Sequence, residues 1–252
     1  MIHMSNIIEN YIETVRIGIN DILPDELLGI YIHGSYAQGT FKWERSYIDM
    51  IVLINKSLSV KQKEDLLNLF ITLKDKGPKK EIEISFLNIH KLFEESHPYS
   101  YEFHYSPYWY KYFEENKWQV TTNKEKLDPD LASHIMNLSV QGIVVCGPEI
   151  KDVFPVISEQ EFIDSLIYDE SDAPLNNVDT IMNLCRSYYF HEKGELISKL
   201  EGLNWMKNNK SDFNELLNLV YELYDNNQNL IPDKYLQEAK NFKDYIDYLK
   251  QE

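Results

Sequence analysis

Two different periods of apolar and polar residues follow one another along the chain. Before residue 157, runs rich in Ile, Val and Tyr are typical of strands at 30–32, 48–54 and 81–88, and amphipathic helices are expected at 5–22 and 61–74. After residue 157, strand patterns disappear and apolar positions recur at helical spacing. The pattern predicts an α+β fold over residues 1–157 and an all-helical bundle over residues 158–252.

Several start and stop signals support this reading. Ser158 with Glu161, and Ser198 with Glu201, have the spacing of a capping box, and Gly194 follows an apolar stripe as a C-terminal cap would. Other expected elements are an alternating strand over 99–105, helices beginning at Pro107 and Asp128, a short apolar run at 143–150 and a last helix over 233–250.

The composition of the chain limits the kinds of molecule that it is expected to bind. With 43% hydrophobic residues the chain can bury a core, and its net charge of −16 argues against a nucleic-acid partner. The charge suits a cationic small molecule, although an acidic surface kept for solubility explains it equally well. No apolar run is long enough to span a bilayer, so we expect a cytoplasmic protein with no membrane partner, either a monomer or a weak homodimer. The 2 cysteines, Cys146 and Cys185, are expected to be buried thiols with no disulfide or zinc role.

The stretch from Tyr31 to Ile54 carries the first candidate chemistry. An apolar run stops at Gly34-Ser35, a loop follows, and a second apolar run has Asp49 near its start. Glycine lets the backbone approach a phosphate, the serine offers a hydroxyl and an N–H, and an acid on the next strand can hold a divalent metal against the same phosphates. An ordinary β-turn at Gly34-Ser35 is the alternative.

Further candidates lie on the later strands. In the run from Glu81 to Asn88, Glu83 alternates with apolar residues and can face the metal site if this strand lies beside that of Asp49. In the alternating run 99–105, Glu102 and His104 share the polar face and could border a pocket. In the helical half, Arg186 and Lys199 could hold a triphosphate, or they could simply be exposed to solvent.

The order Gly34-Ser35, loop, Ser46-x-x-Asp49, apolar strand resembles the signature of the nucleotidyltransferase superfamily related to DNA polymerase β. Over nearly its full length the chain also resembles the aminoglycoside adenylyltransferases that modify streptomycin and spectinomycin. The matching stretches are HGSYAQG, IEISFL, YEFHYSP, DPDLASHIMNLSVQGIVVCGPEI and CRSYYFHEKGELISK.

The resemblance implies a nucleotidyltransferase fold with a mixed sheet, ATP and Mg²⁺ as cofactors, and transfer of AMP to a hydroxyl with release of pyrophosphate. It also implies a role for each matching residue. Gly34, Ser35, Arg186 and Lys199 would bind the nucleotide, Asp49 and Glu83 would hold magnesium, and Glu83 would be the general base.

Two positions depart from the family pattern. Tyr47 stands where the first metal-binding aspartate belongs, and a neutral phenol is a poor ligand for a hard cation. Asn176 falls where relatives that use these drugs carry an acid near the substrate. Glu44 could replace the missing acid, and Tyr47 could instead stack on adenine or substrate. Alternatives to an enzyme acting on a small molecule are a catalytically lapsed nucleotide- or antibiotic-binding protein and an enzyme that adenylylates a protein.

Overall fold

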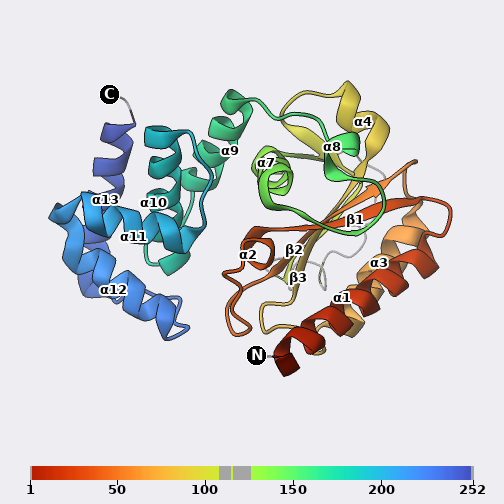
Figure 1. Ribbon diagram of the computed structural model, residues 1–252, viewed down its shortest axis with the longest axis horizontal. Helices are drawn as coiled ribbons and strands as arrows, with labels where there is room; N and C mark the ends of the chain where they lie inside the picture. The colour runs from red at the N-terminus through yellow and green to blue at the C-terminus, as the bar shows by residue number, and fades with distance from the viewer. Residues whose placement is uncertain (1, 108–114, 116–125, 251–252) are drawn as a thin grey trace. The chain divides into compact units, whose positions relative to one another are not determined.

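The computed structural model describes residues 2–107, 115 and 126–250, and their contacts divide the chain into two compact units, 1–162 and 163–252 (Figure 1). The boundary predicted near residue 157 stays a prediction. The helix expected after Pro107 lies outside the described residues. Among the described helices, none is long and apolar enough to cross a membrane.

The first unit is built on a mixed five-stranded sheet in the order β5-β3-β2-β1-β7. Its strands are β1 (Leu27–His33), β2 (Ile48–Ile54), β3 (Ile82–Asn88), β5 (Phe103–Tyr105) and β7 (Ile143–Cys146), and β4 (Tyr99–Tyr101) pairs separately with β6 (Lys126–Asp128). Strands β2 and β3 are parallel, whereas β1 is antiparallel to both of its neighbours and β5 is antiparallel to β3. The predicted fold class is confirmed.

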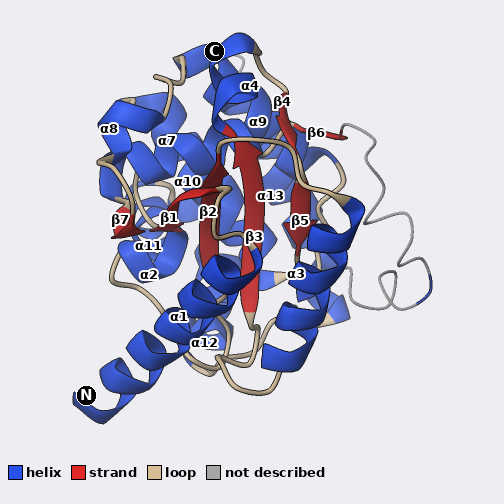
Figure 2. Cartoon of the chain, turned by 90° about the vertical axis from the view of Figure 1, so that its right-hand side faces the viewer, coloured by secondary structure: helices blue, strands red, loops and turns tan. Residues whose placement is uncertain are grey.

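Helices cover the sheet on both sides. Figure 1 and Figure 2 place α1 (Ile2–Ile22) and α3 (Val60–Leu73) on one face, and α7 (Leu131–Gln141) and α8 (Ile150–Val153) on the other. Short helices α2 (Gly34–Ala37) and α4 (Ile89–Glu94) follow β1 and β3 directly. The main core lies between the sheet and helices α1 and α3, where even-numbered strand residues such as Met50, Val52 and Ile84 are buried. Odd-numbered residues of β2 and β3 therefore point to the opposite face.

Two expectations for this unit were wrong. The strand expected over 99–105 is two strands, because the chain leaves β4 and joins a different sheet at Glu102, whose N–H donates to the carbonyl of Phe86. Cys146 is only half-buried, because β7 is an edge strand, whereas Cys185 is fully buried.

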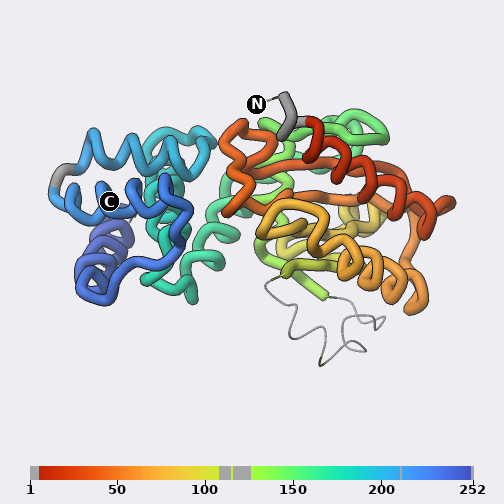
Figure 3. The backbone as a smooth tube through the Cα atoms, turned by 90° about the horizontal axis from the view of Figure 1, so that it is seen from below, coloured from red at the N-terminus to blue at the C-terminus, as the bar shows by residue number. Residues whose placement is uncertain are grey.

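The second unit is helical, as the sequence predicts, and Figure 3 traces it in the teal-to-blue part of the tube. Helix α9 (Glu159–Ser171) begins in the first unit; then come α10 (Val178–Lys193), α11 (Lys199–Asn209), the 3₁₀ turns Ser211–Phe213 and Asp233–Tyr235, α12 (Asn214–Asp225) and α13 (Leu236–Leu249). The capping boxes at Ser158 and Ser198 are present. Gly194 caps α10 in the left-handed conformation.

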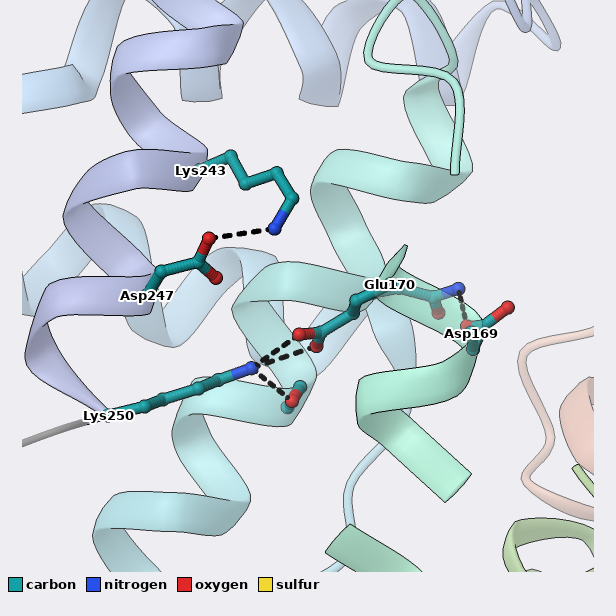
Figure 4. Close-up of polar contacts among 7 residues, drawn as sticks. Asp169, Glu170, Lys243, Asp247 and Lys250 are labelled. Atoms are coloured by element: carbon teal, nitrogen blue, oxygen red, sulfur yellow. Dashed lines mark hydrogen bonds and ion pairs between the residues drawn. The ribbon is translucent and has the colours of Figure 1, made fainter. Parts of the chain in front are cut away.

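A lysine at the end of α13 connects three helices of the second unit. The Lys250 ammonium donates to both carboxylate oxygens of Glu170, at 2.9 and 2.7 Å, and to the Ser187 hydroxyl at 2.7 Å (Figure 4). The Glu170 side chain is only 8% exposed. Lys250 thereby joins the C-terminal helix to α9 and α10 around a buried carboxylate.

Candidate active site

Two carboxylates stand side by side on the parallel strands. Asp49 of β2 pairs in register with Glu83 of β3, and both point away from the apolar core. Both are half-buried, and the Glu83 side chain is 31% exposed. Because directly paired residues of neighbouring strands lie within about 5 Å of each other, the sheet itself holds the two acids together.

Gly34 closes one side of this site. It follows β1 with φ of +65°, a left-handed backbone that glycine adopts without strain. A Cβ at this position would lie 2.1 Å from Oδ2 of Asp49. The backbone of the turn therefore approaches the carboxylate more closely than any side chain would allow. Ser35 follows in the first turn of α2, and both residues are half-buried.

Glu83 also lies beside His104, which reaches it from β5. Nε2 of His104 is 3.8 Å from Oε1 of Glu83, and Nδ1 of His104 is 2.9 Å from the Ser85 hydroxyl. Burial lowers the pKa of His104, Asp128 opposes this and His134 adds to it, so the ring is neutral at neutral pH. A neutral His104 can accept from Ser85 and present an N–H toward Glu83.

Two histidines to which the sequence assigned no role, His33 and His134, lie together beside Asp49 on the neighbouring strand and on α7. His33 pairs with Asp49 across β1 and β2, and its ring centroid is 4.8 Å from that of His134. Burial, with His134 adding to it, holds the pKa of His33 well below its usual value. The apolar run 30–32 indicated that His33 lies at the end of β1. Nothing in the sequence indicated that His134 lies beside it.

Tyr47 lies at the entrance to β2, one residue before the strand. It is half-buried, and Nζ of Lys80 lies 5.0 Å from its ring centroid. Glu44, the acid that could have replaced the missing aspartate, is exposed and forms an ion pair with Lys79.

Glu102 does not share a face with His104, and that expectation was wrong. The break between β4 and β5 turns its side chain toward Ser57, whose hydroxyl donates to it at 2.7 Å, and toward the ammonium groups of Lys63 and Lys91 at 3.4 and 3.3 Å. Ser57 lies beyond the far end of β2 from Asp49. Burial opposes ionisation of Glu102, but the serine hydroxyl and the two lysines outweigh it and keep the pKa of this carboxyl below its usual value. Glu102 therefore does not belong to the candidate site of Asp49 and Glu83.

The remaining predicted residues lie in the helical unit. Arg186 is half-buried on α10 where α11 packs closely, since a Cβ on Gly202 would lie 2.8 Å from the Arg186 backbone. Lys199 begins α11 and its ammonium is 3.8 Å from Asp179. Asn176 is exposed, and its carbonyl accepts from the N–H of Ile231.

The donor set fits one divalent cation. Asp49 and Glu83 offer the anionic oxygens that magnesium prefers, and nucleotide phosphates can complete its shell. Among the described residues, however, no group of three or more His, Cys, Asp or Glu side chains could hold a metal ion by itself. A second cation would lack the carboxylate that Tyr47 replaces.

Two protein-family models match different parts of the sequence. Residues 19–97 match the model of the polymerase β nucleotidyltransferases, and residues 152–250 match the C-terminal domain of the aminoglycoside adenylyltransferases. The chain therefore combines a polymerase β-type nucleotidyltransferase domain with an aminoglycoside adenylyltransferase C-terminal domain. The resemblance noted in the sequence is thereby confirmed.

A solved member with this fold is the spectinomycin adenyltransferase AAD(9) from Enterococcus faecialis, whose structure contains ATP and spectinomycin. The TM-score is 0.80 at 17% identity, and the match covers 97% of this adenylyltransferase-like chain and 99% of that one. A toxin-antitoxin protein, MntA-HpeT, matches 65% of the chain and 86% of its own at 16% identity, with a TM-score of only 0.29. None of the curated proteins compared with the sequence matches it.

Proposed function

We propose that this chain transfers AMP from ATP to a hydroxyl of a small cationic compound, with release of pyrophosphate. The observation that carries the proposal is the in-register pair Asp49 and Glu83 on parallel strands, with the left-handed Gly34 backbone against Asp49. A phosphate-approaching turn and two convergent acids are the parts that phosphoryl transfer requires.

The site residues then have the following roles in the proposed reaction. Gly34 and Ser35 bind the triphosphate through backbone N–H groups and the serine hydroxyl. Asp49 and Glu83 would hold magnesium, which neutralises charge on the phosphate oxygens when bound. The acceptor hydroxyl oxygen attacks the α-phosphorus and its proton passes to Glu83, while the bond from the α-phosphorus to the bridging oxygen breaks and pyrophosphate leaves. Nε2 of His104, 3.8 Å from Oε1 of Glu83, is proposed as a neighbour that limits the positions of this carboxylate. The nucleotide-binding roles of Arg186 and Lys199 stay predictions from the resemblance.

The net charge and a relative of the same fold support the chemical class proposed for the compound that accepts AMP. A net charge of −16 favours a cationic acceptor over a nucleic-acid acceptor. The relative of the same fold was solved with spectinomycin, a small molecule. Asn176, in place of an acid, argues for a different acceptor within the aminoglycoside-like class.

Pyrophosphate release over a panel of aminoglycosides and related amino-sugars tests the proposal. At least one compound should stimulate release from ATP and magnesium, and Glu83→Gln should lower that rate by about 10²–10⁴-fold, because the proton acceptor is lost. Glu94→Gln, an exposed acid on α4, is the matched control and should act like the wild type. Equal rates for wild type and Glu83→Gln would overturn the role of Glu83.

Tyr47 supports a second candidate, a nucleotide-binding protein that has lost catalysis. Its phenol cannot replace a bridging carboxylate. ATP binding by calorimetry without pyrophosphate release for any acceptor would favour this candidate over the enzyme.

A further inference from the structure

The chain enters β3 through an unusual backbone conformation. Glu81 has φ of +64°, in the left-handed region that costs a residue with a side chain about 1 kcal/mol or more. Its carboxylate is buried and accepts from the Tyr105 hydroxyl at 3.0 Å. Tyr105 belongs to the core between the sheet and helices α1 and α3, so Glu81 turns inward although it is odd-numbered.

This reversal changes the direction of the preceding side chain. In an extended strand, a core-facing position 82 would put Lys80 in the core as well. Because Glu81 breaks the alternation, Lys80 instead reaches the Tyr47 ring, with its ammonium 5.0 Å from the ring centroid. An ammonium over an aromatic face is held by the electron-rich ring.

Tyr47 directly precedes Ile48, the first residue of β2, and is two residues from Asp49. Tyr47 and Asp49 are half-buried while Ile48 between them is in the core, and we infer from this pattern that Tyr47 shares the side of Asp49. Position 47 thus carries an aromatic ring in place of a carboxylate, with an ammonium group 5.0 Å from the ring centroid. A divalent cation placed there would meet a positive charge and no anionic ligand from Tyr47.

We propose that Lys80, held over Tyr47, supplies to the triphosphate the positive charge that a second magnesium ion would otherwise supply, so that this site binds ATP with one divalent cation. The inference rests on the proposed nucleotide site at Asp49 and Glu83. A lysine is a common phosphate partner as a point charge. Unlike a metal, it stays in place when chelator is added.

ATP affinity in the presence of EDTA, measured by calorimetry on the full chain, is the decisive quantity. Wild type should bind ATP without metal, Lys80→Met should weaken this binding by about tenfold or more, and Lys80→Arg should retain most of it. The matched control is Lys79→Met, which removes the same charge one residue earlier from a side chain that is 69% exposed and paired with Glu44. It should change the affinity by less than about twofold.

Counting bound Mn²⁺ by electron paramagnetic resonance, with a non-hydrolysable ATP analogue, gives an independent readout. Wild type should bind one Mn²⁺ per nucleotide, and the double variant Tyr47→Asp, Lys80→Met should bind two. Two ions on wild type, or equal metal-free affinities for Lys80→Met and Lys79→Met, would overturn the role of Lys80 while leaving the nucleotide site intact. Failure of wild type to bind ATP even with magnesium would instead overturn the proposed function itself.

Discussion

Gly34 has a left-handed backbone and lies against the carboxylate of Asp49. Replacing it with alanine puts a Cβ 2.1 Å from Oδ2 of Asp49 and forces a side chain into a left-handed backbone. We expect Gly34→Ala to lower ATP affinity in magnesium by tenfold or more, because the turn or the carboxylate must shift. Calorimetry with ATP and magnesium measures this loss.

Gly39 provides the control for that experiment. It also has a left-handed backbone, with φ of +71°, but nothing lies within 4 Å of an added Cβ. Gly39→Ala should therefore show the backbone cost of about 1 kcal/mol in thermal unfolding without the loss of ATP affinity. If both variants bind ATP equally well, the close approach of Gly34 to Asp49 has no part in nucleotide binding.

At the scale of elements, the last helix depends on one lysine. Lys250→Met leaves the Glu170 carboxylate, 8% exposed, without the cation that contacts both of its oxygens. Because removing one partner of a buried ion pair leaves a charge without compensation, we expect a loss of about 3 kcal/mol in the free energy of unfolding. Urea unfolding followed by circular dichroism measures it.

Lys243→Met is the comparison on the same helix. The Lys243 ammonium contacts Asp247 one turn later at 2.8 Å, but the Asp247 side chain is 42% exposed (Figure 4). Solvent screening limits such a pair to about 0.3–0.5 kcal/mol. A similar loss for both variants would mean that burial of Glu170 does not set the contribution of Lys250.

For the whole molecule, the net charge of −16 sets a response to salt. Like charges repel one another in the compact state, and the Debye length falls from about 30 Å at 0.01 M to about 8 Å at 0.15 M salt. The thermal unfolding midpoint should therefore rise by a few degrees over that range of sodium chloride. A midpoint that falls with salt would show that local ion pairs outweigh the overall repulsion.

Much of this architecture could be predicted from the sequence, because it depends on local patterns. The apolar pattern predicted strands where β1, β2 and β3 lie and the helical character of the second unit, and alternation put Asp49 and Glu83 on one face. The strand break at Glu102 could not be predicted, because alternation continues through it and only tertiary contacts with Lys63 and Lys91 turn the side chain away. The contact of Lys80 with Tyr47 could not be predicted either, because the left-handed backbone of Glu81 reverses the expected direction of the Lys80 side chain.

The left-handed residue before β3 also constrains how this connection can vary in length. One residue added between Lys80 and Ile82 would restore simple alternation and swing the lysine away from Tyr47, even if every strand kept its hydrogen bonds. Residues added before Lys79, in the turn that follows α3, would leave that direction unchanged. Insertions before Lys79 should therefore keep the contact of Lys80 with Tyr47, whereas insertions between Lys80 and Ile82 should remove it.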